Sequence, residues 1–514
     1  MTDALHNFTL DSVLEEHGRS YPGKTATVFG DTRHTFDELR VRVDRLANAL
    51  QSVGVGAGDR VLWLGQNAHR VLELLLACAR VGALFCPANW RQTAEELAFV
   101  LEDLEPEVVV WQDEEVGSAV RAGRERAAGH KSLWLQHDAS GAGSYEAFLA
   151  SAPATRREAI GDPTQPLLML YTAAFDGRPC GAMLSQTAIL LQCMTLARTQ
   201  GVGNDTVFLN SGPLFHLGTM MSTLSTFVCG GTNVFVRRSD AATIAQAISN
   251  EHCTGGFLVG STMEEIVALN AGGTYDLRSF RSRPYSPAWD AMVTPDPSQA
   301  LFFGYGQTEA MGLVTFSHYA PGGIGRCGRP SPSVQLRVVD DTGNDVPAGQ
   351  TGEIVLRGPL VMNGYWRRPE INAHRERDGW YHTNDLGCRE ADGTLTFVGP
   401  KVHMIKSGVE NIYPAEVEGC LRQHPAVADC GVIGVPHERW IQTVKAIVAL
   451  KPGATATEAE LIEYCKARIA SYKKPSSVAF VERIPRGPTG DVDHSSLDRD
   501  FGGGNYPGAG TRTT

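Results

Sequence analysis

Short apolar segments and longer amphipathic segments alternate along the N-terminal third of the chain. Residues 60–64 and 108–111 have the composition of buried strands, and the periodicity over residues 36–53 predicts an amphipathic helix that Gly54 ends. Residues 26–29 and the polar turn that follows predict a hairpin. Strands that alternate with helices predict an α/β fold, with layers of helices on both faces of a largely parallel sheet.

The length of the chain predicts more than one domain, because 514 residues exceed what a single hydrophobic core serves. We expect a large N-terminal domain over residues 1–399, since 394–398 resemble a strand and the pattern changes after it. A small α+β domain is expected over 400–495. Its predicted elements are a helix over 413–421 and strands over 431–435 and 444–450. Residues 496–514, which end in a Gly- and Thr-rich run, are expected to be disordered.

Composition excludes several classes of protein. A formal net charge of −11 argues against a nucleic-acid partner, because neutralising phosphates requires clustered Lys and Arg. The apolar stretch 71–88 contains Glu73 and Arg80, so it is interpreted as a buried helix followed by a strand, and no transmembrane segment is expected. Eleven scattered cysteines without a CxxC pair, and an N-terminus without a signal-like apolar run, predict reduced thiols and a cytoplasmic location.

Six segments, in order along the chain, resemble the motifs of the AMP-forming adenylating enzymes. This superfamily includes acyl-CoA synthetases, luciferases and the adenylation domains of peptide synthetases. The segments are YTAAFDGRPCGAML (171–184), PLFH (213–216), YGQTE (305–309), DGWYHTNDLG (378–387), GVENIYPAE (408–416) and PRGPTGDV (485–492). The resemblance covers about residues 20 to 495. It implies a small C-terminal domain that rotates between two catalytic poses about a hinge residue.

The resemblance implies roles for individual residues. Thr308 would contact the α-phosphate of the nucleotide, Glu309 would help to hold Mg²⁺, and His216 would lie near the acyl pocket. Asp385 keeps the position that binds the ribose hydroxyls. The implied nucleotide-binding positions are Tyr305, Gly306, Asp385, Gly177 and Gly181. The cofactors implied are Mg²⁺ with ATP or AMP, and CoA, and the implied partners are a small-molecule acyl substrate and a second copy in a homodimer.

The phosphate loop departs strongly from the family pattern. Its members usually place small hydroxylic residues and glycines there, whose N–H and O–H groups surround the phosphates of ATP, together with a lysine. In this chain Cys180 takes the position of the lysine. The small hydroxylic and glycine positions are taken by Ala173, Ala174, Phe175 and Asp176.

Further departures concern the C-terminal motifs. The family's PTGK lysine serves adenylation, and Asp491 stands in its place, so an anion would face the triphosphate. In the GRxxD motif the Arg, hinge and Asp positions fall on Pro400, Val402 and His403. The adenine-side GGAP segment is unrecognisable, with 284–287 its nearest candidate.

These losses leave two interpretations open. The chain is either an enzyme that has lost ATP-driven adenylation but still binds an acyl group, an acyl-AMP or an acyl-CoA, or an enzyme with a site rebuilt for another substrate. Conventional ATP-dependent ligation is disfavoured. In family members the second half-reaction, thioester formation, runs without the PTGK lysine. Thioester formation can therefore persist in a protein that has lost the first half-reaction, adenylation. The alternative from another class is a non-catalytic binding protein on the same fold, which could pair with an active relative.

Several residues also have plainer interpretations. Cys180 could be a nucleophile, but a cysteine is more often a small buried apolar residue. Asp176 could bind a metal, but it also suits a turn, and His403 is expected to be an exposed loop histidine. The pair Lys473 and Lys474 could meet the phosphates of CoA or simply be solvated. Thr308, Glu309 and Asp385 could each persist as structural hydrogen-bonding groups.

Overall fold

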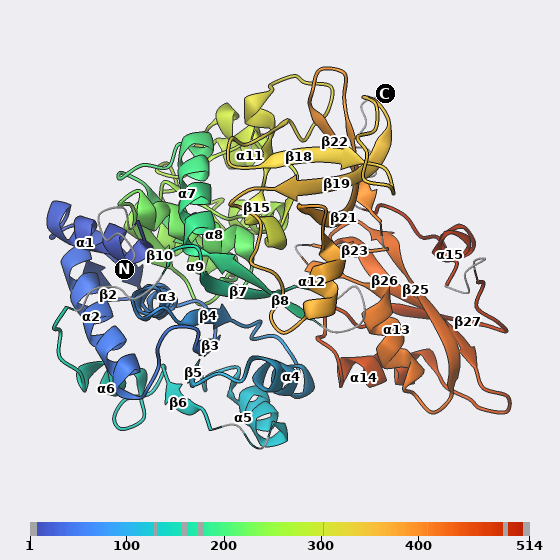
Figure 1. The fold of residues 1–514 in the computed structure, drawn as a ribbon, viewed down its shortest axis with the longest axis horizontal. Coiled ribbons are helices and arrows are strands. Elements are labelled where there is room, and N and C mark those ends of the chain that lie inside the picture. Colours follow the sequence, from blue (N-terminus) through green and yellow to red (C-terminus); the bar gives the residue numbers. More distant parts are fainter. Residues whose placement is uncertain are drawn as a thin grey trace.

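The structure is a computed structural model that describes residues 8–127, 129, 131–156, 162–172, 179–301, 303–401, 403–408, 410–486 and 492–506. It is a mixed α/β protein with a large N-terminal part and a small C-terminal part, which stand side by side (Figure 1). The predicted α/β class is therefore confirmed. Every helix among the described residues is too short or too polar to cross a bilayer.

Two sheets organise the N-terminal part. The first has the order β6 (Leu133–Gln136), β5 (Val108–Trp111), β3 (Arg60–Leu64), β4 (Leu84–Pro87), β7 (Pro166–Thr172) and β8 (Cys180–Ser185). Its strands pair in parallel except for the antiparallel β7–β8 pair. The second has the order β11 (Gly255–Gly256), β9 (Val207–Asn210), β10 (Thr232–Phe235), β1 (Thr25–Phe29) and β2 (Thr32–Thr35). The predicted strands 60–64 and 108–111 and the predicted hairpin are confirmed.

Helices cover both sheets. They are α1 (Leu10–Ser20), α2 (Phe36–Ser52), α3 (His69–Val81), α4 (Ala94–Leu104), α5 (Gly117–Arg126), α6 (Tyr145–Ala150), α7 (Gln186–Gln200), α8 (Leu217–Val228), α9 (Ala241–Glu251), α10 (Gly260–Leu269) and α11 (Pro287–Asp290). Helix α2 begins at a capping box, in which the side chains of Thr35 and Glu38 each accept a hydrogen bond from the other's backbone N–H. It ends at Ser52, just before the predicted Gly54.

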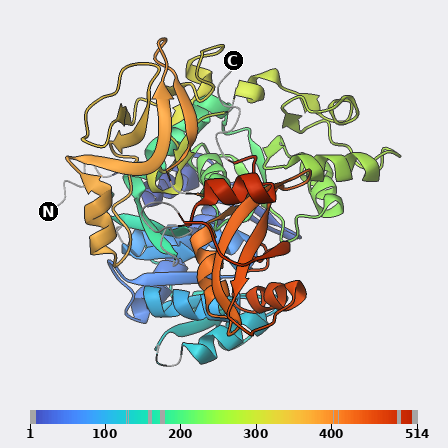
Figure 2. The ribbon, with the colours of Figure 1, turned by 90° about the vertical axis from the view of Figure 1, so that its right-hand side faces the viewer.

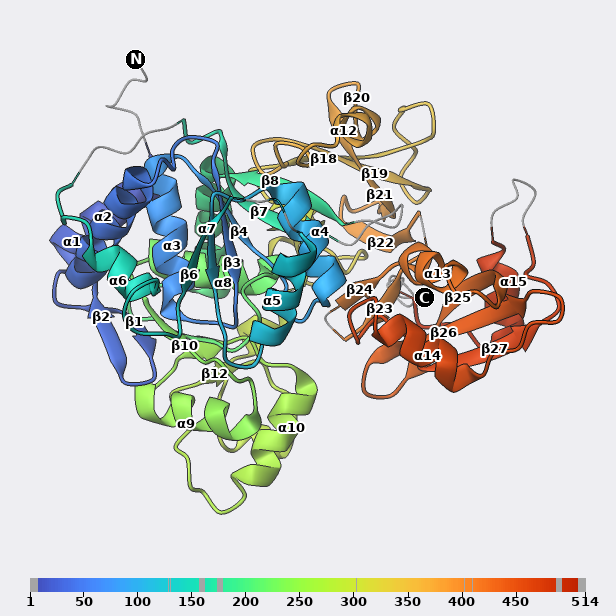
Figure 3. The ribbon, with the colours of Figure 1, turned by 90° about the horizontal axis from the view of Figure 1, so that it is seen from below.

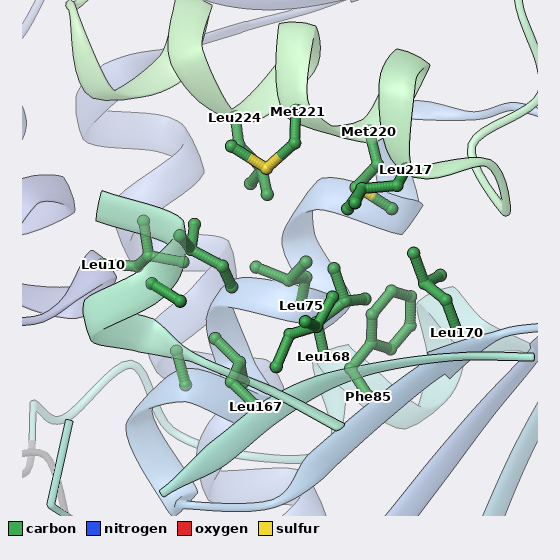
Figure 4. Packing of buried hydrophobic residues seen from close by; sticks show 14 of the residues in the cluster. Leu10, Leu75, Phe85, Leu167, Leu168, Leu170, Leu217, Met220, Met221 and Leu224 are labelled. Atoms are coloured by element: carbon green, nitrogen blue, oxygen red, sulfur yellow. The ribbon is translucent and has the colours of Figure 1, made fainter. Parts of the chain in front are cut away.

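The main core lies between the first sheet and helices α3, α7 and α8. Leu75 of α3, Phe85 of β4 and Leu168 of β7 face Met221 and Leu224 of α8 (Figure 4). All five side chains are at most 2% exposed, which makes their burial a principal source of stability. Tyr305 and Tyr381, which recur in the candidate site, belong to the same buried cluster.

The apolar stretch 71–88 is a buried helix followed by a strand, as predicted. Its two charged residues are buried but paired, since Arg42 Nε donates to Glu73 Oε1 at 2.6 Å and Arg80 Nε to Asp11 Oδ1 at 2.7 Å. Arg80 also contacts Asp44. Pairing offsets the desolvation that an isolated buried charge would suffer.

A third, antiparallel sheet follows. It contains β18 (Gln335–Val339), β19 (Thr351–Arg357), β21 (Trp380–Arg389), β20 (Glu376–Arg377) and β22 (Leu395–Pro400), with α12 (Pro369–Arg375) beside it. Short pairs precede it: β12 (Arg281–Ser282) with β13 (Thr294–Pro295), β14 (Gly306–Gln307) with β15 (Gly312–Leu313), and β16 (Thr315–Phe316) with β17 (Arg329–Pro330). The 3₁₀ segments are η2 (Pro297–Leu301), η3 (Thr308–Ala310) and η4 (Ser317–Tyr319).

The described residues of the C-terminal part form a five-stranded sheet with three helices, which lies beside the N-terminal layers in Figure 3 and in front of them, facing the viewer, in Figure 2. Its strands are β24 (Glu410–Ile412), β23 (Ile405–Ser407), β26 (Ile441–Leu450), β25 (Val427–His437) and β27 (Ser477–Val481). Its helices are α13 (Pro414–Arg422), α14 (Glu458–Lys466) and α15 (His494–Phe501). The α+β character predicted for this part is confirmed.

The expectation that disorder begins at residue 496 is wrong. Helix α15 runs through that position, and Leu497 on it is fully buried against Ile433 and Ile447 of the C-terminal sheet. The described chain continues to Tyr506, whose hydroxyl accepts a hydrogen bond from Gly434 N at 2.9 Å. Residues 507–514 lie outside the described residues.

Candidate active site

Four polar side chains form one hydrogen-bonded network on β14 and β21. Tyr305 Oη donates to Asp385 Oδ2 at 2.8 Å, and Gln307 Nε2 donates to the same oxygen at 3.0 Å. Tyr381 Oη donates to Gln307 Oε1 at 2.9 Å. The structure thus brings together Tyr305 and Asp385, two predicted nucleotide-binding residues. Sequence reasoning did not assign Gln307 or Tyr381 to this site.

The carboxyl group of Asp385 titrates near neutrality in this network. Burial raises its pKa to about 7, against the opposing effect of the hydrogen bond from Tyr305. The negative charge of Glu309 also raises this pKa. Asp385 is therefore only partly ionised at pH 7. The ionised carboxylate offers both oxygens as acceptors for ribose hydroxyls, whereas the protonated carboxyl turns one of them into a donor.

Glu309 is a buried acceptor beside this network. It lies on η3, one residue after the half-buried Thr308, and Tyr365 Oη donates to Glu309 Oε1 at 2.9 Å. A buried carboxylate with a fixed orientation suits a hard cation such as Mg²⁺. The residues described here therefore fit Mg²⁺ at Glu309, which is the predicted metal position.

The predicted glycine positions have packing roles. A Cβ on Gly306 would come 1.9 Å from Gly312 O, so the close approach of β14 to β15 requires glycine. A Cβ on Gly181 would meet Met169 Sδ at 2.6 Å. Gly177 and the loop residues 173–176 lie outside the described residues.

The lysine position of the phosphate loop supplies no charge. Cys180 begins β8 and is 7% exposed, which agrees with its interpretation as a small buried apolar residue. The charge of a Cys180 thiolate would raise the pKa of Arg368, so this guanidinium is within electrostatic reach. Arg368 Nη2, however, donates to Asp103 Oδ1 at 2.7 Å. Its positive charge is therefore engaged within the protein.

The arginine position of the hinge motif is also uncharged. Pro400 is the register partner of Asp385 in the β21–β22 pair, so this position lies directly opposite Asp385 in the sheet. The next residue, Lys401, directs its Nζ to Glu353 Oε2 at 3.0 Å. Val402 and Asp491 lie outside the described residues. At Cys180 and Pro400, the structure provides no cation for a triphosphate.

His216 meets the C-terminal domain. It precedes α8, and its Nε2 lies 3.2 Å from Glu410 Oε1 at the start of β24. Arg91 Nη2 donates to the same carboxylate, and its guanidinium lies over the rings of Phe215 and Tyr472 at 5.1 and 5.5 Å. The predicted acyl-pocket histidine therefore contacts Glu410, whose ion pair with Arg91 joins the two domains.

Residue Tyr413 extends this interdomain contact toward the nucleotide side. Burial raises the pKa of its hydroxyl, and the negative charges of Glu309 and Asp385 raise it further. The segment 410–413 of the C-terminal domain therefore faces both His216 and the Glu309–Asp385 side of the N-terminal domain.

A second buried contact joins the two domains. Lys473 Nζ donates to Glu96 Oε1 of α4 at 2.9 Å and to Glu416 Oε1 of α13 at 2.6 Å. The lysine is 4% exposed, and the charge of Glu416 raises its pKa against the effect of burial. The interpretation of Lys473 as a solvated charge is therefore wrong, and a role for it at the phosphates of CoA conflicts with this pairing.

His403 is half-buried rather than exposed, which corrects its prediction as an exposed loop residue. Its ring stacks on His494 with the centroids 4.7 Å apart, and its Nε2 lies 3.4 Å from Asp498 Oδ2. Tyr506 contacts the ring edge-on. This prediction failed for the same reason as the prediction of disorder from residue 496. Residues 494–506 fold onto the C-terminal sheet and cover the loop that carries His403.

An exposed tryptophan lies beside the segment that meets His216. Trp440, at the β25–β26 turn, is 43% exposed, and Arg439 lies 4.9 Å from its ring centroid. A Cβ on Gly408 would come 3.3 Å from the Trp440 ring, so the indole covers the start of the 408–416 motif. An exposed indole with a guanidinium suits a nucleotide base, such as the adenine of CoA. No motif in the sequence marked Trp440.

A large α/β domain with a small α+β domain against it is the architecture of the adenylate-forming enzymes. The chain belongs to the AMP-binding enzyme family: the family model described as "AMP-binding enzyme" matches residues 14–366, and that described as "AMP-binding enzyme C-terminal domain" matches 416–490. It is an acyl-CoA synthetase-like member of this AMP-forming family, and the resemblance inferred from the six motifs is confirmed.

Relatives with assigned activities align with nearly the whole chain. A feruloyl-CoA synthase from Amycolatopsis sp. is 36% identical, over 97% of this chain and 100% of its own length. An indoleacetate–CoA ligase from Aromatoleum aromaticum is 34% identical, over 94% of this chain and 96% of its own. Among solved structures, a fatty acyl CoA synthetase from Mycobacterium tuberculosis superposes with a TM-score of 0.67 at 27% identity, covering 96% of this chain and 98% of its own.

Proposed function

We propose that this chain is a CoA ligase for an aromatic carboxylic acid, in which thioester formation is retained and ATP-driven adenylation is impaired. AMP-forming ligases use ATP, Mg²⁺ and CoA. Two relatives at 34–36% identity carry the names of ligases for feruloyl and indoleacetate groups, which supports an aromatic acyl group as substrate. The catalytic residues of the proposal are Thr308, Glu309 and His216.

The observation that carries the proposal is the contact between His216 and Glu410. This contact supports the proposal because segment 410–413 of the C-terminal domain meets His216, the residue to which the proposal gives the acyl side, and Trp440 is exposed beside it. In thioester formation the sulfur of CoA attacks the acyl carbonyl carbon, the C–S bond forms, the C–O bond to AMP breaks, and the thiol proton leaves. This step needs the acyl group and the thiol side by side, and it expels AMP rather than pyrophosphate.

The impairment of adenylation follows from charge. Expelling pyrophosphate requires cations or N–H donors that stabilise the charge developing on the leaving group. Cys180 and Pro400 supply none, Arg368 and Lys401 are engaged with carboxylates, and the sequence has Asp491 at the position of the lysine. We therefore assign the impairment to adenylation alone and not to thioester formation.

The two half-reactions can be measured separately. Synthetic feruloyl-adenylate or indoleacetyl-adenylate is mixed with CoA and the purified full chain, and acyl-CoA is quantified by chromatography. ATP–pyrophosphate exchange is measured with the free acids. Acyl-CoA formation with exchange at background supports the proposal. Exchange at a rate matching that of a conventional ligase contradicts the impairment, and no acyl-CoA from any adenylate contradicts the ligase.

One observation favours a non-catalytic binding protein as the second candidate. Tyr305, Gln307, Tyr381 and Asp385 satisfy one another's hydrogen bonds without a nucleotide. A self-satisfied network is a feature that a structural role would preserve. Isothermal calorimetry with AMP separates the two candidates, because a binding protein without a nucleotide site gives no heat.

The organisation of the whole protein is part of the proposal. We place the domain boundary near residue 399, since β22 ends at Pro400 and β23 begins at Ile405. A cytoplasmic location agrees with eleven free cysteines. A homodimer remains a proposal that sedimentation analysis would test.

A further inference from the structure

Three metal-ligating side chains meet in the N-terminal domain, on the side away from the C-terminal domain (Figures 1 and 3). His34 lies on β2, and His69 and Glu73 lie one turn apart at the start of α3. One ligand atom from each of the three lies within 4.8 Å of the others. Glu73 Oε1 is 3.8 Å from both His34 Nδ1 and His69 Nε2. None of the three belongs to the candidate active site.

Of the three side chains, His69 is the one whose burial is not explained by its surroundings. It is 2% exposed, and neither ring nitrogen has a hydrogen-bond partner among the described residues. Buried polar groups almost always have a partner, so an orphaned imidazole points to a missing water or ion. A neutral imidazole presents a lone pair, and it is the form that binds metals.

Hydrogen bonds already fix the orientation of the Glu73 carboxylate, as they do for a carboxylate that binds a metal ion. Arg42 donates to both of its oxygens, at 2.6 and 3.0 Å, and Tyr145 Oη donates to Oε2 at 3.0 Å. A carboxylate oxygen has two lone pairs, so Oε1 can accept from Arg42 and still offer one to a cation. Outer hydrogen bonds of this kind fix ligand geometry in metal sites.

The charges around the group are balanced. Glu146 accepts from Arg42 at 2.9 Å and pairs with Arg70 at 2.8 Å. Two guanidinium groups therefore face two carboxylates, and the surroundings present no net positive charge to an incoming cation.

We propose that His34, His69 and Glu73 bind a divalent transition-metal ion, with Zn²⁺ as the reference. Two imidazoles and one carboxylate are a donor set that suits Zn²⁺, with water in the fourth position. Ligand bonds of about 2.0–2.1 Å in a tetrahedron place ligand atoms about 3.4 Å apart. The 3.8 Å separations from Glu73 Oε1 need only a small closure, whereas the two imidazoles, whose ligand atoms lie within 4.8 Å of each other, must approach more. His34, the most exposed of the three, can supply it by rotating.

The ion would tie the β1–β2 hairpin to α3 and would have a structural role. This inference does not rest on the proposed ligase activity. Its test therefore uses binding and stability, so that it can fail or succeed independently of catalysis.

The experiment titrates Zn²⁺ into the untagged, EDTA-treated full chain by calorimetry and follows thermal unfolding with and without the metal. Co²⁺ substitution adds the visible absorption of a tetrahedral site. We expect one ion per chain, a higher melting temperature with metal, and affinity lowered at least about tenfold in His69→Ala and His34→Ala. His34→Ala keeps the test meaningful if the buried His69→Ala variant fails to fold.

His137→Ala is the matched control. His137 is also buried, and neither of its ring nitrogens has a hydrogen-bond partner among the described residues, but it stacks on Trp63 and lies outside the cluster. It should bind Zn²⁺ as the native chain does. Absence of binding by the native chain, or undiminished affinity in His34→Ala and His69→Ala, would overturn the proposal.

Discussion

His216 of the N-terminal domain and Glu410 of the C-terminal domain form an interdomain pair, with His216 Nε2 3.2 Å from Glu410 Oε1. Burial alone would raise the pKa of Glu410, but the hydrogen bond with His216 and the charge of Arg91 lower it to about 2. The carboxylate is therefore ionised throughout the physiological range. It is a fixed acceptor that holds the imidazole in place.

Replacing Glu410 with Gln should slow thioester formation. The substitution keeps the shape and removes the charge, and a charge-assisted hydrogen bond contributes about 1.5–3 kcal/mol. A loss of that size corresponds to roughly a 10- to 100-fold fall in rate. The measurement is acyl-CoA production from a supplied acyl-adenylate. Glu482→Gln, an exposed glutamate on the same domain, is the control, and an unchanged rate in Glu410→Gln would count against the positioning role.

Replacing Glu96 with Gln should loosen the contact between the domains. Lys473 would keep its 2.6 Å partner Glu416 and lose its 2.9 Å charged partner on α4. We expect about 1.5–3 kcal/mol less stabilisation of this domain arrangement, which is the range for charged hydrogen bonds. Tryptic cleavage at Lys401 should accelerate several-fold.

The neighbouring Glu95→Gln variant is the control for this prediction. Glu95 is 59% exposed and lies near Arg126 within its own domain. If both variants are cleaved at the same rate as the native chain, the Glu96 contact does not hold the domains together.

Local patterns predicted most of the regular elements. Strands β3 and β5 and helix α2 were predictable because their periodicity is complete within a few residues. Helix α15 was not, because its polar sequence carries Leu497 as its main anchor, and that burial exists only against the strands that hold Ile433 and Ile447. Tertiary packing decides such a segment, and periodicity cannot show it.

Of the residues in the candidate site, only those that lie within recognisable motifs were predicted from the sequence. Tyr305 and Asp385 were both assigned from motifs, and they meet. The partners that join the domains were missed: Arg91 contacts Glu410 across 319 positions of sequence, and Glu96 contacts Lys473 across 377. Such pairs depend on how two domains dock, and no short motif records that arrangement.

Replacing Trp440 with Ala should weaken CoA binding and leave AMP binding unchanged. Removing an aromatic platform for a nucleotide base costs about 1–3 kcal/mol, so the KM for CoA should rise roughly tenfold. Trp380→Ala is the matched control, since Trp380 also packs against arginines, at 4.8 Å from Arg357, but lies outside the site. Equal KM values in the two variants would remove Trp440 from the CoA site.

AMP affinity should increase with pH through the titration of Asp385. With a pKa raised to about 7, the carboxyl is about one-tenth ionised at pH 6 and about nine-tenths at pH 8. Because only the ionised form accepts from both ribose hydroxyls, the Kd for AMP should fall severalfold between these values. Calorimetry at both pH values measures it, and Asp385→Asn should lose the dependence. The same shift means that the stability of the folded chain falls as the pH rises from 3.8, the ordinary pKa of this carboxyl, to about 7, because over that range the folded chain still holds a proton that the unfolded chain has lost.

Restoring the two missing lysines should recover adenylation if charge alone was lost. Cys180→Lys with Asp491→Lys returns a cation to the start of β8 and to the PTGK position, although Asp491 lies outside the described residues. We expect ATP–pyrophosphate exchange at least about tenfold above the native chain, since each cation near a triphosphate acts on the developing charge. Each single variant should gain far less, because the other position would stay uncharged or negative. The single variants and Cys180→Ser serve as controls, with circular dichroism to verify folding at the buried Cys180. A folded double variant without exchange would locate the defect on the adenine side, where the family's GGAP segment is unrecognisable and residues 284–287 are its nearest candidate.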